Sequence, residues 1–281
     1  MIGWLIYSAE DVEKNKYYIQ MHMDKFAVYN VAIDLIIVEE IKNLYEFIKA
    51  NRPDFAINRS RNAEVAEELE SEGIRVFNSS VVTKIANNKG KTYELLEGVV
   101  PFLPVKYGDK IITSGISGDD FSYPYVIKSC GGHGGSQVFM AENEQEEKSA
   151  IETIGNDEYV VQQCCSNLGK DIRVFIIGNK IVKAVLRTSE NSFKSNYSLG
   201  GRVEEYTLND QEQDMINAIL KKMSLDYAGV DFIFHNDKAV FNEIEDAVGA
   251  RMLYQVSDID IVQIYVDYIM EELRGISLFN H

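Results

Sequence analysis

Three carboxylates near the C-terminus have the residue types and spacing of a cation site. Two apolar runs flank a polar turn between residues 228 and 245, a pattern that is typical of a β-hairpin. Side chains alternate along a strand, so Glu243 and Glu245 share a face, and an odd-length turn would set Asp231 opposite Glu243. Like charges repel unless a cation lies between them, and oxygen ligands of this kind suit magnesium shared with a nucleotide phosphate. A solvated hairpin face is the alternative at this point.

A second segment has the composition of a phosphate-binding loop. Lys128 ends an apolar run and is followed by Gly131, Gly132, Gly134 and Gly135. Glycines allow the backbone to fold over an anion and present amide hydrogens to it, and the lysine adds positive charge. The spacing is not that of a P-loop, and a flexible turn remains the alternative. We expect His133, inside this loop, to be a solvated side chain.

Composition narrows the class of protein. The chain has 281 residues, 46% of them hydrophobic, and a formal net charge of -16. This acidic balance argues against a nucleic-acid surface, and no apolar run has the length of a membrane span. The apolar N-terminus is too short and acidic for a secretory signal. Three cysteines without metal-ligand spacing, Cys130, Cys164 and Cys165, indicate a reduced cytoplasmic setting.

The elements needed to position these residues begin with a small α/β domain over residues 1–78. Strands alternate with helices there, which predicts a parallel sheet covered by helices. The expected strands are 1–7, 34–38, 55–58 and 74–77, and the expected helices are 11–31, 39–50 and 63–72.

Beyond residue 78 the pattern is mixed. Residues 79–96 are mostly helical, prolines at 101 and 104 predict a break, and the Gly- and Ser-rich segment 107–123 predicts a loop. The expected strands are 125–128, 137–140, 159–163, 171–177 and 181–187, followed by the acidic hairpin. The expected helices lie within 142–155 and over 211–222 and 259–273, and residues 188–202 are expected to be irregular.

Five separated pieces of sequence carry a resemblance to a known family. They are Asn88-Lys89, Lys128 with its glycine loop, residues 161–165 before Asp171-Ile172-Arg173, residues 193–196 before Gly200-Gly201, and Asp231 before residues 242–245. This series resembles the ATP-grasp superfamily, specifically the RimK-type carboxylate–amine ligases. The resemblance covers the chain from about residue 75 to its end.

The resemblance implies an α/β (α+β) ATP-grasp fold. Its parts would be an N-terminal Rossmann-like pre-ATP-grasp domain over 1–78, a central lid subdomain over 79–163, and a C-terminal mixed-sheet subdomain with the metal site over 164–281. The implied reaction is ATP-dependent: a substrate carboxylate is phosphorylated, an amine attacks the acyl phosphate, and an amide, ADP and phosphate result.

The resemblance also implies roles for individual residues. Arg187, Arg173 and Lys128 would be catalytic. The ATP-binding set would comprise Lys89, Lys128, Gly131, Gly132, Gly134, Gly135, Gln162, Gln163, Cys164, Cys165, Asp171 and Asn196. Asp231, Glu243 and Glu245 would bind magnesium, with manganese as the alternative metal.

Further implied properties concern partners. The substrates would be a small carboxylic acid and an amine, such as an amino acid or peptide, with no nucleic-acid or membrane partner, and a homodimer is left open. A non-catalytic nucleotide-binding module and an ATP-grasp enzyme with another acceptor are the alternative functions.

The chain departs from the family pattern at three places. Glu245 stands where the family usually has Asn, which predicts a shifted metal preference or a higher magnesium requirement. Gln163 stands where relatives often have Glu, and Cys164 where many have an aromatic residue, so nucleotide preference is less certain than nucleotide binding. Lys194 replaces an arginine and loses its bidentate fork.

Two further arginines are candidate substrate residues. Arg59 follows a strand of the first domain, where it could clamp a ligand carboxylate or form a surface ion pair. Arg251 follows Gly249-Ala250 just beyond the acidic hairpin, where the family often places substrate-contacting groups.

Overall fold

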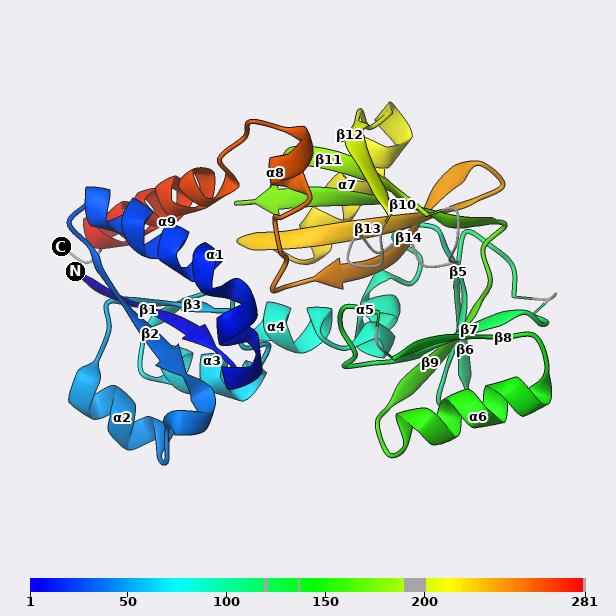
Figure 1. The fold of residues 1–281 in the computed structure, drawn as a ribbon, viewed down its shortest axis with the longest axis horizontal. Helices are drawn as coiled ribbons and strands as arrows, with labels where there is room; N and C mark the ends of the chain where they lie inside the picture. Colours follow the sequence, from blue (N-terminus) through cyan, green and yellow to red (C-terminus); the bar gives the residue numbers. More distant parts are fainter. Residues whose placement is uncertain (119–120, 136, 190–200, 280–281) are drawn as a thin grey trace.

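The computed structural model of the protein describes residues 1–118, 121–135, 137–189 and 201–279, with side chains described up to residue 275 (Figure 1). Two sheets organise these residues, one of four strands and one of ten. Lys194 and Asn196 lie outside the described residues.

The four-stranded sheet forms the N-terminal domain and confirms the predicted parallel α/β arrangement. Its strands lie in the order β2-β1-β3-β4, and each neighbouring pair is parallel. The strands are β1 (Ile2–Tyr7), β2 (Ala32–Ile37), β3 (Phe55–Asn58) and β4 (Arg75–Phe77). The helices are α1 (Ala9–Val28), the 3-10 turn η1 (Val38–Glu40), α2 (Leu44–Asn51) and α3 (Ala63–Ser71). Helix α2 begins later than predicted because the Asn43 side chain caps it by accepting from the Glu46 amide.

The predicted break and loop between residues 101 and 123 are wrong in part. Helices α4 (Ser80–Ala86) and α5 (Lys89–Leu96) are followed by a hairpin of β5 (Phe102–Tyr107) and β6 (Lys110–Ser114). The register shifts between Phe102 and Val105, so Pro104 falls at an irregularity in the ladder. A strand tolerates proline there because its missing N–H is not needed.

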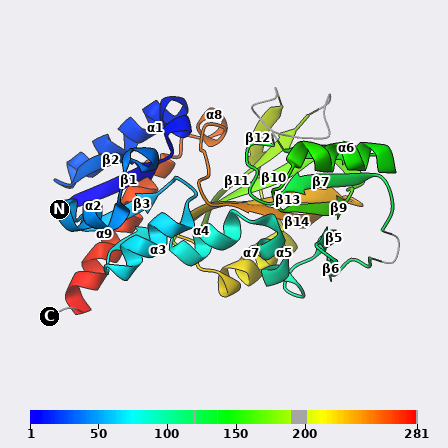
Figure 2. The same ribbon diagram turned by 90° about the horizontal axis from the view of Figure 1, so that it is seen from below.

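The ten-stranded sheet spans the rest of the molecule in the order β12-β11-β10-β13-β14-β5-β9-β7-β8, with β6 paired to β5 (Figures 1 and 2). Its other strands are β7 (Tyr125–Ser129), β8 (Val138–Ala141), β9 (Tyr159–Gln163), β10 (Asn167–Ile177), β11 (Lys180–Thr188), β12 (Arg202–Tyr206), β13 (Tyr227–His235) and β14 (Lys238–Glu245). The helices are α6 (Glu144–Ile154), α7 (Asp210–Lys222), α8 (Leu253–Val256) and α9 (Ile261–Phe279). Strand β12 and helix α8 are elements that the sequence patterns did not predict.

The acidic hairpin of β13 and β14 has the predicted pairing for a different reason. Its turn contains only Asn236 and Asp237, both with positive φ (50° and 59°), as two-residue hairpins favour. The register shifts by one residue beyond Phe232, where Asn242 is the extra residue of a β-bulge. The bulge, and not an odd-length turn, therefore sets Asp231 opposite Glu243.

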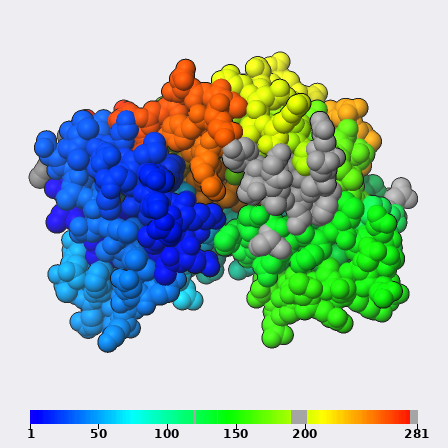
Figure 3. All heavy atoms as spheres, in the orientation of Figure 1, coloured from blue at the N-terminus to red at the C-terminus, as the bar shows by residue number. Residues whose placement is uncertain are grey.

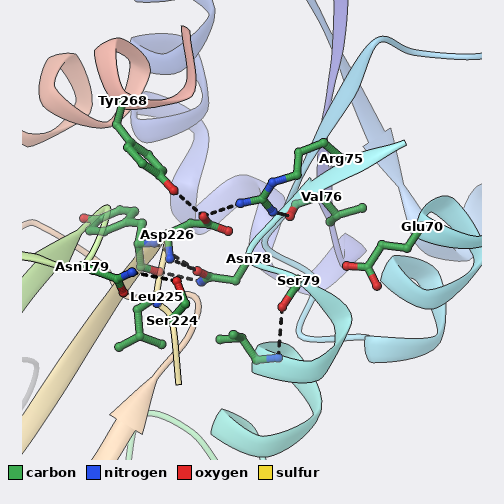
Figure 4. A network of polar contacts seen from close by, with 12 residues as sticks. Glu70, Arg75, Val76, Asn78, Ser79, Asn179, Ser224, Leu225, Asp226 and Tyr268 are labelled. Atoms are coloured by element: carbon green, nitrogen blue, oxygen red, sulfur yellow. Dashed lines mark hydrogen bonds and ion pairs between the residues drawn. The ribbon is translucent and has the colours of Figure 1, made fainter. Parts of the chain in front are cut away.

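The C-terminal helix returns to the N-terminal domain, where α9 lies beside α1 in both ribbon views (Figures 1 and 2). One apolar core includes Phe26 of α1 and Tyr265 of α9. Polar contacts join the same region: Arg75 and Tyr268 both bond to the Asp226 carboxylate, at 2.5 and 2.6 Å (Figure 4). The predicted boundaries at residues 78 and 163 remain predictions, since the large sheet continues across the second.

Asn78 fastens the end of the first domain to the large sheet. Its side-chain oxygen accepts from the Asp226 and Tyr227 amides at 2.7 and 3.0 Å (Figure 4). Its side-chain nitrogen donates to the Tyr227 carbonyl and to Asp246 at 2.7 and 2.6 Å. Every polar atom of this buried amide is thus used.

Within the described part of the chain, no helix combines the length and apolar character needed to cross a bilayer.

Candidate active site

Four adjacent strands of the large sheet present charged side chains to one face. Register places Asp171 of β10 opposite Arg187 of β11, and Arg173 of β10 opposite Asp231 of β13. Asp231 is in turn opposite Glu243 of β14. Directly opposed residues of antiparallel strands share a face, so the predicted carboxylates and arginines lie side by side.

These side chains form a continuous series of ion pairs. Arg187 donates to both oxygens of Asp171 at 2.5 and 2.8 Å and to Asp231 Oδ2 at 2.6 Å. Arg173 donates to both oxygens of Asp231 at 2.8 and 2.7 Å, and its Nη1 lies 2.5 Å from Glu245 Oε2. Bidentate arginine–carboxylate contacts fix orientation as well as charge.

Asp231 is the centre of this series and is fully buried (0% exposed). Burial alone would raise the pKa of Asp231, but the charges and hydrogen bonds of Arg173 and Arg187 outweigh it and hold the pKa at about 2. Asp231 is therefore ionised at neutral pH.

The predicted metal carboxylates differ in how they are engaged. Glu243 is a third exposed and has Lys89 Nζ at 3.6 Å, whereas Asp231 and Glu245 are held by arginines. Carboxylate oxygens at this position fit magnesium. Among the described residues, however, no three Asp, Glu, His or Cys side chains already form a metal-binding group. The donor set is suitable, but a metal has to share it with the arginines.

Two lysines, Lys89 and Lys128, contact β14 at the border of the charged face. The buried Lys128 of β7 donates to Asn242 Oδ1 at 2.7 Å, its one hydrogen bond within the described residues. Burial, together with the nearby charge of Lys89, lowers the pKa of Lys128 to about 8 although Glu243 opposes the shift. A buried cation with a neutral amide as its partner is poorly compensated, and an anion of suitable size would complete its environment.

Lys89 connects this corner to the glycine loop. It is the first residue of α5, which Asn88 caps, and its Nζ donates to the Gly132 carbonyl at 2.5 Å. The loop turns back through Gly134 and Gly135, whose φ values of 65° and 76° suit glycine. The structure thus brings the two predicted lysines and the glycines together.

The predicted hinge residues have structural partners. The Gln163 amide bonds the backbone nitrogen and oxygen of Ser122 at 3.0 and 2.9 Å, and so fixes the segment before β7. The buried Gln162 donates to the Tyr93 hydroxyl at 2.9 Å. Burial raises the pKa of both the Cys164 and Cys165 thiols, so these free cysteines are protonated at neutral pH.

The two candidate substrate arginines lie in different settings. Arg59 is buried (5% exposed), donates to the Tyr7 hydroxyl and the Val248 carbonyl at 2.8 Å each, and lies over the Tyr18 ring. Of the two alternatives for Arg59, the surface ion pair is therefore wrong, and the role in substrate binding stays a prediction. In the structure Arg59 ties the first domain to the loop after β14. Arg251 is exposed on that loop.

Sequence reasoning missed two residues of the site. Asn242 holds Lys128 by its side chain, and its backbone carbonyl accepts from the Tyr93 hydroxyl at 2.6 Å. A polar residue interrupting the apolar side of the hairpin was the signal for Asn242. Tyr93 had no signal, because a tyrosine within an amphipathic helix is typical of a core.

The space-filling view shows a notch between the N-terminal domain and the segment that carries α6 (Figure 3). The site itself combines a sheet face of ion pairs with two lysines and a glycine loop.

Comparisons with known proteins agree with this architecture. The model of the RimK-like ATP-grasp domain matches residues 104–269. A probable alpha-L-glutamate ligase of Haemophilus influenzae is 30% identical over 218 residues, covering 73% of this chain and 70% of its own. The protein MG011 of Mycoplasma genitalium is 28% identical over 271 residues, covering 95% and 91%. D-alanine–D-alanine ligase from Bacillus anthracis complexed with ATP superposes with a TM-score of 0.75 at 17% identity, with full coverage of both chains.

The fold and the site define an ATP-grasp protein, as the resemblance of the sequence implied. More particularly, the chain belongs to the RimK-like ATP-grasp family. It is an ATP-dependent ligase that joins a carboxylate to an amine. Such ligases use ATP together with divalent metal ions.

Proposed function

We propose that ATP binds across the charged sheet face, with its phosphates on Lys128 and Lys89 beneath the glycine loop. The observation that carries this assignment is the buried Lys128, whose partner is the neutral amide of Asn242. A lysine that only stabilised the fold would be expected to have a carboxylate partner at this depth. The adenine would lie against the hinge, residues 162–165. Asn196, outside the described residues, stays a prediction for a group near the γ-phosphate.

The other charged residues have roles that follow from repulsion between the two reacting anions. ATP and a carboxylate repel each other, so positive groups must neutralise them before oxygen can approach phosphorus. Arg187 and Arg173, held by Asp171 and Asp231, supply fixed positive charge at the sheet face. Asp231, Glu243 and Glu245 would hold magnesium, which supplies further neutralisation and orients the phosphates.

The proposed reaction has two steps. The substrate carboxylate oxygen bonds to the γ-phosphorus and the bond to ADP breaks. The amine nitrogen next bonds to the carbonyl carbon, phosphate leaves, and the amine loses a proton. Both steps need positioning and exclusion of water more than covalent help from the protein.

For the substrates, we propose an amino acid or peptide as the amine or acid partner, with glutamate as the first to test. The support is the name of the relative from Haemophilus influenzae. Arg59 is proposed to position the loop that carries Arg251, and Arg251 to contact the substrate. The free cysteines support a reducing, cytoplasmic setting.

One observation favours a second candidate, a module that binds nucleotide without turnover. Asp231 and Glu245 are both engaged by Arg173, which would weaken a metal site if the contacts persisted. This module would bind ATP but release no ADP with any pair of acid and amine.

The test is a screen for ADP release with amino acids and dipeptides, ATP and magnesium. We expect release that requires both an acid and an amine, and hydroxylamine should trap the acyl phosphate when the amine is omitted. Lys128→Met should lower the rate at least about 100-fold, whereas Lys106→Met, an exposed lysine on β5, should not change it.

Binding provides a second, independent measurement. ATP at about 100 times its dissociation constant should stabilise the wild-type protein by about 2.7 kcal/mol. Stabilisation without ADP release would favour the binding module. Absence of both would refute the proposed function.

A further inference from the structure

The side chain of Arg173 passes a glycine on its way to two carboxylates. Gly229 on β13 is opposite Glu245 on β14 and lies two residues from Asp231. A Cβ on Gly229 would come within 3.4 Å of both Cδ and Nε of Arg173 and within 2.8 Å of Val248. The arginine side chain therefore passes over Gly229 and extends between Asp231 and Glu245.

The geometry of this contact is that of a held side chain. Three donor groups of one guanidinium are used: Nε and Nη2 toward Asp231 and Nη1 toward Glu245. The side chain of Arg173 is 7% exposed and that of Glu245 is 26% exposed. An ion pair this sheltered is screened less by solvent than a surface pair.

The charges on the sheet face balance only if Glu245 is acidic. The face carries four cations, Arg173, Arg187, Lys89 and Lys128, and four anions, Asp171, Asp231, Glu243 and Glu245. Replacing Glu245 with the neutral amide usual in the family would leave one positive charge in excess before any ligand binds.

We propose that Glu245 is the counter-ion of Arg173, and that it fixes this arginine in the metal-free protein instead of serving as a third metal carboxylate. The metal is then left to Glu243, the most exposed of the three carboxylates, and Asp231 can contribute only beside the two arginines that already hold it. This assignment rests on the proposed function. Glu245 is thus a positioning residue for Arg173, and this contact explains an acidic residue where an amide was expected.

The first test measures thermal unfolding in EDTA, where neither metal nor nucleotide contributes. Glu245→Gln keeps the size of the side chain but removes its charge, and should lower the Tm by about 3 °C or more. Glu243→Gln is the matched control on the same strand and face. No hydrogen bond or ion pair joins Glu243 to Arg173 among the described residues, so this variant should lower the Tm by less than Glu245→Gln does.

A double-mutant cycle assigns the loss to Arg173. Lysine cannot make the three contacts of the guanidinium, so Glu245→Gln should cost much less in an Arg173→Lys background than in the wild type. Equal losses in the two backgrounds, or no loss in the wild type, would overturn the proposal.

Manganese binding, followed by the loss of the free-ion EPR signal, should show the opposite order. Glu243→Gln should weaken manganese binding about 10-fold or more and Glu245→Gln less than about 3-fold. Equal weakening by both variants would make Glu245 a metal ligand and refute the inference. If the wild-type protein bound no manganese, the proposed function would fail, while unfolding in EDTA would still decide the role of Glu245.

Discussion

The two halves of the candidate site balance their charges differently. On the strand half, built by β10, β11, β13 and β14, Asp231 receives three hydrogen bonds from two arginines. The other half, which we call the lid half, consists of Lys89, Lys128 and the glycine loop. There Lys128 has the neutral Asn242 as its partner, and the nearest carboxylate oxygen to Lys89 is 3.6 Å away. The strand half is stabilised by its own ion pairs. The charges of the lid half are less well compensated by the protein itself.

The largest effect should come from breaking the strand half. Asp231→Asn would leave Arg173 and Arg187 buried without their shared carboxylate, and should lower the free energy of unfolding by about 3–5 kcal/mol. Urea denaturation measures this, with the exposed Asp258→Asn as the control. A loss below about 1 kcal/mol would show that the series of ion pairs is not what holds these strands.

The same comparison has a pH signature. The pKa of Asp231 is held below its ordinary value, so its contribution is present above about pH 4 and disappears as the pH falls toward about 2. The difference in stability between wild type and Asp231→Asn should shrink over that interval.

A smaller effect of opposite sign is expected in the lid half. Because burial lowers the pKa of Lys128 to about 8, its charge destabilises the ligand-free fold. Lys128→Met should therefore raise the free energy of unfolding at pH 7 by about 1–3 kcal/mol while weakening ATP binding.

The sign follows from proton linkage. Between about pH 8 and 10.5 the unfolded chain binds more protons at Lys128 than the folded protein does. As the pH increases over this interval, the free energy of unfolding of the wild type therefore rises relative to that of Lys128→Met. Unfolding measured at pH 7, 8.5 and 10 checks this, with Lys106→Met as a flat reference. A destabilised Lys128→Met protein would contradict the contrast between the halves.

The smallest effect should come from making the lid half resemble the strand half. Asn242→Asp replaces the amide oxygen that lies 2.7 Å from Lys128 Nζ with a carboxylate oxygen. It should stabilise the ligand-free protein by about 1 kcal/mol and weaken ATP binding about 10-fold, because the new pair competes with phosphate. Calorimetric titration with ATP measures the second effect, and Asn242→Ala separates loss of the amide from gain of charge. If the affinity for ATP were unchanged in Asn242→Asp, the weakly compensated charge of Lys128 would not be what binds phosphate.

Much of the fold was predictable because local patterns were strong. The strand Tyr159–Gln163 was predicted to the residue, and the alternation of strands with helices predicted the parallel first domain. The hairpin of β5 and β6 was missed because two prolines and a Gly- and Ser-rich segment are typical of loops. A ladder irregularity at Pro104 made the strand feasible, and no local pattern reveals such an irregularity.

The site was predictable wherever strand alternation or a motif fixed the position of a side chain. Glu243 and Glu245 could be placed on one face because they are two residues apart. Asp231 faces Glu243 only because of the bulge at Asn242, which the expected odd-length turn did not include. Arg59 could not be placed, since its tyrosine neighbours come from β1, α1 and β13. Tertiary packing turned an expected surface residue into a buried connection between domains.

The family, the lysines, the glycine loop and the acidic strand could all be identified from the sequence, because residue types and short spacings carry those signals. The pairing of the charges could be read only from the folded chain. The pairing of Arg173 with both Asp231 and Glu245 depends on three strands and on the bulge at Asn242. Ion pairs of this kind act over a few ångströms between residues far apart in the chain, so their partners are fixed only when the strands are in register.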